Sequence, residues 1–139
     1  MTTTTATKAS EALRLAREMF TFYVLGDTPG MRSLFAPDAH VVIPGDPALV
    51  PWAGVYTGAQ ADLFHSRVKD SVDVLEYTVK SYEPHGDTVI AFCRELGRVK
   101  ATGKRFVTEH VGILTVRDGR IVRYLEYGDT AAFQTAFTE

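Results

Sequence analysis

The sequence has a single cysteine, Cys93, among 139 residues, so no disulfide can form within one chain. No apolar run approaches the ~20 residues that cross a bilayer as a helix, and the N-terminal MTTTTATKAS lacks the apolar stretch of a secretory signal. Lysine and arginine number 15 against 17 aspartates and glutamates, and they form no basic stripe of the kind that binds nucleic acid. These absences argue against a disulfide scaffold, a membrane protein and a nucleic-acid binder. They favour a soluble, cytoplasmic protein.

Motifs for metal, nucleotide or serine-hydrolase chemistry are missing as well. The histidines and the cysteine occur in none of the spacings HxH, HExxH or CxxC that hold metal ions. The chain also has no GxSxG motif, phosphate-binding glycine loop or dinucleotide fingerprint. We therefore expect no metal and no cofactor, and we expect His65 and His85 at the surface.

The sequence does contain enough apolar material for one core. Hydrophobic residues make up 45% of the chain and charged residues 23%, and 139 residues is a usual length for one domain. Residues 1–7 are rich in threonine and poor in apolar side chains. We predict a disordered tail over 1–7 and a single domain over 8–139.

The first half of the chain predicts helices. Apolar residues recur with helical spacing over 8–25, and Gly26 follows where a helix would end. Asp27 and Pro29 suit the start of a short second helix, which Pro37 would stop. A brief strand at 40–43 and a third helix over 59–71 are also expected.

Between these last two elements, residues 44–58 contain three prolines and three glycines. Such a composition predicts an ordered loop rather than a helix or strand. Its apolar residues exceed what a free linker would carry. We expect either a structural flap or a lid over a ligand pocket.

The second half predicts strands, because the apolar period changes from about 3.6 residues to 2. The strands are expected at 73–83, 88–100, 105–117 and 120–128. Turn signals separate them, and Asp129 with Thr130 would cap a final helical turn. Helices followed by antiparallel strands indicate an α+β fold with the helices on one face of a curved sheet.

The strand at 105–117 is apolar on both faces, since Leu114 and Val116 alternate with Val111 and Ile113. A strand of this kind is covered on both sides. The helices cover one side, and a second copy of the chain would cover the other most simply. We therefore expect a homodimer through the outer face of the sheet.

Three ionisable residues, Glu95, His110 and Glu126, can share one face of this sheet. A two-residue loop at 102–103 would place Glu95 opposite His110. If the turn at 118–119 is a three-residue loop with its glycine in the bulge position, His110 also lies opposite Glu126; a two-residue Asp-Gly turn would point Glu126 away. In an apolar pocket, such a row could hold one group as acid and another as base. Alternatively, the row lies on the solvent face or forms a satisfied polar ladder.

A family resemblance rests on three stretches: LGDTPGMRSLFAPDAHVVIPG at 25–45, PWAGVYTG at 51–58 and ATGKRFVTEHVGILTVRDGRIVRYLEYGDTAAF at 101–133. They resemble the SnoaL-like, ketosteroid-isomerase-related branch of the nuclear transport factor 2-like superfamily. The resemblance implies a cone-shaped, curved antiparallel sheet wrapped around the N-terminal helices, with a deep apolar cavity and usually a homodimer. It implies no single reaction, because this fold hosts isomerases, polyketide cyclases, epoxide hydrolases and non-catalytic binding proteins.

Residue by residue, the resemblance disfavours some of these reactions. The base, tyrosine and aspartate of ketosteroid isomerases correspond to Ile43, Met19 and Gly112, so that form of the reaction is disfavoured. In epoxide hydrolases, the Asp on the last strand corresponds to Glu126 and the Arg-x-Asp to residues 93–95, which keeps two carboxylates and loses the arginine. The acid of SnoaL-type cyclases also corresponds to Glu126. The resemblance thus favours the bulged turn and an inward-facing row.

These inferences converge on a cofactor-free acid/base enzyme that acts on a small, largely apolar organic molecule in an enclosed cavity. Glu126 would be the main general acid/base, His110 would bridge and tune it, and Glu95 would be the second carboxylate. Further residues expected to bind the substrate are Trp52, Tyr124, Cys93, Tyr56 and Tyr23. The alternative is a non-catalytic small-molecule-binding or dimerisation module of the same fold.

Overall fold

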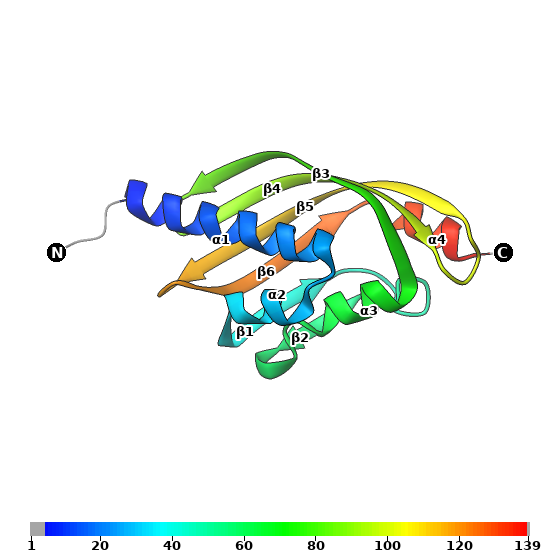
Figure 1. The fold of residues 1–139 in the computed structure, drawn as a ribbon, viewed down its shortest axis with the longest axis horizontal. Helices are drawn as coiled ribbons and strands as arrows, with labels where there is room; N and C mark the ends of the chain where they lie inside the picture. The colour runs from blue at the N-terminus through cyan, green and yellow to red at the C-terminus, as the bar shows by residue number, and fades with distance from the viewer. Residues whose placement is uncertain (1–4, 139) are drawn as a thin grey trace.

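One curved sheet and the helices on its inner face make up the part of the chain that the computed structural model describes, residues 5–138 (Figure 1). The helices are α1 (Thr5–Leu25), α2 (Thr28–Leu34), α3 (Leu63–Ser71) and α4 (Thr130–Phe137), with a 3-10 turn at Gly58–Gln60. The strands are β1 (Phe35–Ile43), β2 (Gly54–Thr57), β3 (Val72–His85), β4 (Thr88–Val99), β5 (Arg105–Arg117) and β6 (Arg120–Gly128).

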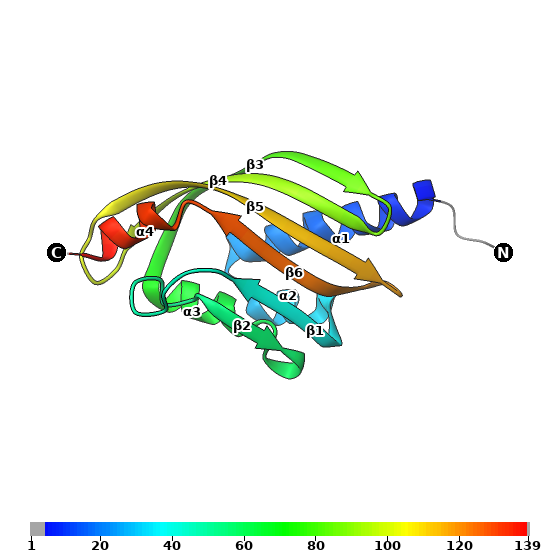
Figure 2. The ribbon, with the colours of Figure 1, turned by 180° about the vertical axis from the view of Figure 1, so that it is seen from behind.

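The strands lie in the order β2-β1-β6-β5-β4-β3, and the sheet curves around α1. This long helix packs against β3, β4 and β5, with Met19 and Leu15 buried on its inner side. Seen from behind, β5 and β6 lie in front of α1, and α4 lies at the far end of the strands (Figure 2). The α+β fold that the sequence pattern predicts and the curved sheet around the helices that the family resemblance implies are both confirmed.

One strand pairing departs from the antiparallel sheet that we predicted. β1 runs parallel to β6, with Val41 opposite Tyr124, and antiparallel to β2. β1 also begins at Phe35, five residues earlier than the predicted strand. Its register with β6 shifts between Phe35 and His40. Pro37 lies in this interval, and a proline has no N–H with which to continue the hydrogen-bond ladder.

The prediction that residues 44–58 form no regular element is wrong for the last part of this segment. Residues 54–57 form β2, which pairs with the end of β1. The loop before β2 is packed rather than free, since Val50 and Trp52 are buried. The indole of Trp52 meets the ring of Phe133 on α4 edge-on, with ring centres 5.0 Å apart. The loop is therefore packed between β1 and α4.

The hairpin between β4 and β5 has a different register from the predicted one. The two strands are joined by four residues, 100–103, instead of two. Cys93 therefore lies opposite His110, and Glu95 lies opposite Thr108. A shift of two residues moves each side chain along the sheet without changing its face. Glu95 and His110 still face inward, as predicted.

The hairpin between β5 and β6 combines the two predicted alternatives. Its turn is the two-residue Asp118-Gly119 form, in which both residues have positive φ, 52° and 74°. That turn alone would point Glu126 outward. A bulge at Val122 adds one residue to β6, so that Glu126 faces inward opposite Gly112. The predicted glycine bulge is wrong, and the predicted facing is correct.

The helix ends follow the capping residues in the sequence. The side chain of Asp27 accepts a hydrogen bond from Gly30 N at the start of α2, and Asp129 caps α4 in the same way. α1 begins at Thr5, so residues 5–7 of the predicted tail are helical, while residues 1–4 lie outside the described residues. Within 5–138, no helix is both long enough and apolar enough to span a bilayer.

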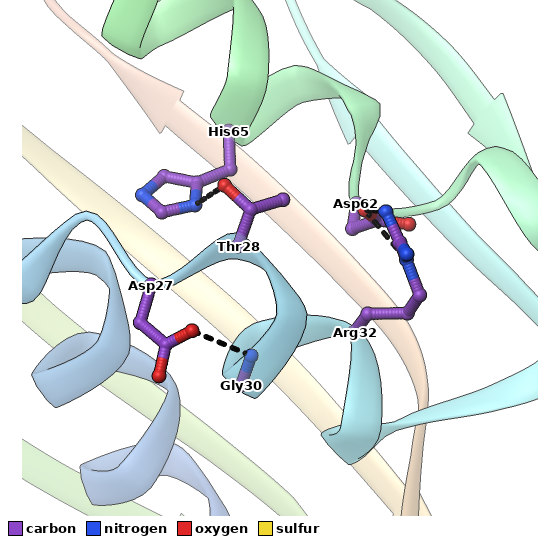
Figure 3. A network of polar contacts seen from close by, with 6 residues as sticks. All are labelled: Asp27, Thr28, Gly30, Arg32, Asp62 and His65. Atoms are coloured by element: carbon purple, nitrogen blue, oxygen red, sulfur yellow. Dashed lines mark hydrogen bonds and ion pairs between the residues drawn. The ribbon is translucent and has the colours of Figure 1, made fainter.

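Two polar contacts, one buried and one partly exposed, join α2 to the α3 region (Figure 3). His65 Nδ1 lies 3.0 Å from Thr28 Oγ1, and its Nε2 lies 3.3 Å from the carbonyl oxygen of Tyr23. Because a carbonyl can only accept, Nε2 donates and the neutral ring accepts from Thr28 at Nδ1. Burial lowers the pKa of His65, which agrees with a neutral ring. The expectation that His65 lies at the surface is wrong.

The second contact in Figure 3 is an ion pair between Arg32 and Asp62. The guanidinium donates twice to Asp62 Oδ2, at 3.0 and 2.8 Å. The Asp62 side chain is only 6% exposed, so it depends on this arginine for its hydrogen bonds. Together the two contacts fix α2 and α3 beneath the end of α1.

Replacing Thr28 with valine removes the hydroxyl that His65 Nδ1 uses while keeping the side-chain shape. A buried acceptor without a partner costs about 1–3 kcal/mol. We expect Thr28→Val to lower the free energy of unfolding by that amount in urea denaturation at pH 7.5. Ser33→Ala, which removes an exposed hydroxyl from the same helix, is the control and should change it by less than ~0.5 kcal/mol. Equal stability of both variants would contradict the assigned hydrogen bond.

Candidate functional site

Glu95, His110 and Glu126 lie on the face of the sheet that α1 covers, one each on β4, β5 and β6. Glu95 is 3% exposed and His110 is 8% exposed, whereas the Glu126 side chain is 20% exposed. We call these three residues the inner row. The structure therefore brings together the three ionisable residues that the sequence singled out.

The carboxyl group of Glu95 is held from the opposite side of the cone. The hydroxyl of Tyr23 on α1 donates to Glu95 Oε1 at 2.8 Å. Burial raises the pKa of Glu95 to about 7; the hydrogen bond from Tyr23 opposes this shift and the charge of Glu126 adds to it. At neutral pH Glu95 is thus divided between its acid and carboxylate forms. It can act as a proton donor or as a proton acceptor.

His110 and Glu126 also have tyrosine partners. His110 Nε2 lies 2.8 Å from the Tyr77 hydroxyl and 3.5 Å from Glu126 Oε1, and Tyr124 donates to that same Oε1 at 2.9 Å. Burial raises the pKa of each of these phenols well above its ordinary value, so they stay protonated. His110 therefore contacts Glu126 directly, as predicted, but its second neighbour is Tyr77 rather than Glu95.

One atom of the row has no partner in the part of the chain that the structure describes. His110 Nδ1 is buried and makes no hydrogen bond to any described residue. In either neutral tautomer this nitrogen has one unmade hydrogen bond, which costs about 1–3 kcal/mol if nothing fills it. His110 and Glu126 line a hollow of about 10 Å³, walled by Trp52 and Phe133. That is room for about one water molecule.

The small hollow differs from the deep apolar cavity that the family resemblance implies. Aromatic rings fill the space between the helices and the sheet: Phe20 of α1 stacks on Tyr77, and Phe64 of α3 stacks on Tyr124, each with ring centres 5.9 Å apart. The space beside the inner row is therefore occupied by side chains of the protein. An organic substrate could reach the row only if some of them moved.

Two glycines make room for the inner row. A Cβ at Gly128 would lie 2.4 Å from the Cβ of His110, and a Cβ at Gly112 would lie 2.9 Å from the Tyr124 hydroxyl. Both distances are shorter than side-chain atoms tolerate. Gly128 thus permits the position of His110, and Gly112 permits the phenol that holds Glu126.

The five predicted substrate-binding residues lie in different places. Tyr23 and Tyr124 bind the carboxylates, and Trp52 lines the hollow. Cys93 is buried opposite His110, and burial raises its pKa to about 11, so it remains a thiol. Tyr56 is directed elsewhere: its hydroxyl donates to the carbonyl of Trp52 and accepts from Arg67.

Tyr77 is a candidate site residue that the sequence pattern missed. It lies on β3 opposite Glu95, and its hydroxyl reaches His110. Bulges between Val74 and Glu76 and between Val79 and Ser81 interrupt the alternation of this strand. The alternation of Tyr77 with Leu75 and Val79 was the available signal in the sequence. Among residues 5–138, no three His, Cys, Asp or Glu side chains come together as a possible metal site.

Several comparisons with known proteins agree with this fold. A structure of a nuclear transport factor 2-like protein from Burkholderia xenovorans LB400 is 26% identical, with a TM-score of 0.79 over 94% of this chain and 98% of its own. A candidate isomerase from Bacillus subtilis is 25% identical, with a TM-score of 0.75 over 97% and 96%. TerC, co-crystallised with polyporic acid, is 20% identical and shares the fold, with a TM-score of 0.79 over 91% and 98%. A search of curated proteins found no match.

The match to a family model covers two of the three inner-row residues and ends two residues before Glu126. The model, described as a SnoaL-like domain, matches residues 16–124. This range is more than half of the chain and includes Tyr23, Tyr77, Glu95 and His110. The chain therefore belongs to the SnoaL-like domain family, with the nuclear transport factor 2-like fold.

Proposed function

We propose that this protein is a cofactor-independent acid/base enzyme that isomerises, cyclises or hydrolyses a small, largely apolar organic molecule, such as a cyclic ketone or an epoxide. The observation behind the proposal is the inner row itself, in which two tyrosine-bound carboxyl groups lie to either side of a buried imidazole. The raised pKa of Glu95 supports it, because an acid/base site needs groups that exchange protons near neutral pH.

In this proposal Glu126 is the main general acid/base. It is the most exposed member of the row, and it lines the hollow. His110, 3.5 Å from Glu126 Oε1, fixes and tunes that carboxylate. Glu95, which is partly protonated at neutral pH, is the second group that donates a proton. Carboxyl groups in two different environments can serve as acid and base in one reaction.

A second candidate function is a non-catalytic module that binds a small molecule or another copy of the chain. One observation favours it: the carboxyl groups of Glu95 and Glu126 each already have a tyrosine hydroxyl as partner. A binding module would retain these contacts when a ligand is present and would turn over no substrate.

We further propose that the chain forms a homodimer through the outer face of the sheet. This face exposes Phe92, Val107 and Tyr127 at 38, 45 and 53%. Phe92 and Tyr127 border a shallow hollow of about 200 Å³ across β4, β5 and β6. An exposed apolar patch of this kind on a sheet is a usual contact between subunits.

Replacing Glu126 with glutamine tests the catalytic proposal. Glutamine keeps the size of the side chain and cannot exchange a proton, so we expect turnover to fall about 10²–10⁴-fold. The measurement is a product assay with a panel of epoxides and cyclic ketones, carried out with the wild type and the variant. Glu83→Gln, an exposed change on β3, is the control and should retain wild-type turnover. Unchanged turnover in Glu126→Gln would remove Glu126 from the mechanism.

Replacing Glu95 with glutamine tests the ionisation of the row without a substrate. The folded-state pKa of about 7 lies above the ordinary 4.5, so folding favours the protonated form. That stabilisation is complete below pH 4.5 and is lost as the pH rises through 7. We therefore expect Glu95→Gln to gain stability relative to the wild type between pH 4.5 and 8.5, by on the order of 1–3 kcal/mol in urea unfolding. A difference in unfolding free energy between the two proteins that stays constant with pH would contradict the raised pKa of Glu95.

The dimer is tested by molar mass in solution. Light scattering is expected to give twice 15.3 kDa for the wild type at 100 µM and 15.3 kDa for Phe92→Asp, because a buried charge disfavours the interface. Val24→Asp places the same charge on an exposed residue of α1 and should leave the dimer intact. A monomeric wild type would contradict the proposal.

A further inference from the structure

A second cavity, of about 260 Å³, lies between the end of α1, the helix α3 and the start of β3. Tyr23 and His65 form part of its wall. It differs from the hollow beside the inner row, since it opens to solvent and contains neither His110 nor Glu126. The proposed function makes no use of this cavity.

Two lysines give one side of this cavity a positive charge. Lys69 Nζ donates to the carbonyl of Gly26, and Lys100 Nζ donates to the carbonyl of Lys69, each at 2.6 Å. An ammonium group has three N–H donors, so each lysine has two more to offer. The wall includes one acid, Asp73, whose carboxylate lies 3.4 Å from Arg98. The local balance of charge therefore favours an anion.

The rest of the wall is apolar. Val68 and Val72 are buried at its base, with 3% exposed in each case. At its rim, Val24 and Leu25 are 52 and 71% exposed. A ligand in the cavity would therefore remove apolar surface from water, which is the main favourable term in such binding.

We propose that this cavity binds a small organic anion, with its carboxylate on Lys69 and Lys100 and its apolar part against Val68, Val72 and Leu25. A cavity of about 150 Å³ holds benzene, so 260 Å³ has room for a phenyl ring and a carboxylate. The ring of such a ligand would lie beside Tyr23, the residue whose hydroxyl binds Glu95.

Phenylacetate and its neutral analogue phenylacetamide are suitable probes. In a ¹H–¹⁵N NMR titration, phenylacetate is expected to shift the amides of residues 23–26, 65–74 and 100 with saturation. Phenylacetamide is expected to bind at least tenfold more weakly, because it lacks the charge. Equal affinity of the two probes, no saturable shift, or shifts centred on residues 52, 110, 126 and 133 would each overturn the proposal.

Two variants separate the charge effect from loss of structure. Lys69→Gln with Lys100→Gln should weaken phenylacetate at least tenfold, whereas Lys80→Gln with Lys104→Gln changes the net charge equally and should not weaken it. Because Lys69 and Lys100 also hold backbone carbonyls, Leu25→Glu provides a second test. It adds a negative charge at the exposed rim and should weaken phenylacetate more than phenylacetamide. Wild-type affinity in both the lysine pair and Leu25→Glu would overturn the site.

Discussion

The buried carboxyl group of Glu95 imposes the constraint on which the interior of this protein depends. A carboxylate that leaves water loses its hydration, and the cost is several kcal/mol unless hydrogen bonds replace it. Tyr23 provides such a bond from α1, 2.8 Å away, and its ring fills part of the same space. Tyr124 does the same for Glu126, and Tyr77 for His110. Tyrosine suits this task because its body is apolar and its tip is polar.

The facing of the inner row could be predicted from the sequence, although neither hairpin register could. Side chains alternate along a strand, so an error of two residues between β4 and β5 preserved the faces of Glu95 and His110. Glu126 faces inward only if the turn and any bulge together add an odd number of residues between the paired parts of β5 and β6. The turn at 118–119 adds two residues, and the bulge at Val122 adds a third, which brings Glu126 to the inner face. No turn residue in the sequence marks that bulge, so only the family resemblance indicated the inward facing.

Other features depend on contacts between segments that are far apart in the sequence, and a local pattern of residues does not specify such contacts. The parallel pairing of β1 with β6 joins segments about eighty residues apart, and nothing local to either strand specifies it. Tyr77 lies between two bulges, where alternation no longer indicates a face. The burial of His65 follows from the packing of α2 and the end of α1 against α3, where Thr28 and the carbonyl of Tyr23 meet its ring. The volume of the interior depends on ring positions, so the small hollow could not be predicted from composition.

The aromatic filling that stabilises the cone also restricts what can reach the inner row. The sheet cannot open there without breaking its ladder, because β4, β5 and β6 are paired along most of their lengths. The other walls of the hollow are the loop before β2 and the helix α4. α4 has eight residues, too few for a stable helix by itself, and it depends on Phe133 packing against Trp52 and Phe106. Movement of α4 and this loop would therefore cost less than any change in the sheet. The contact of Trp52 with Phe133 therefore closes this side of the hollow beside His110 and Glu126.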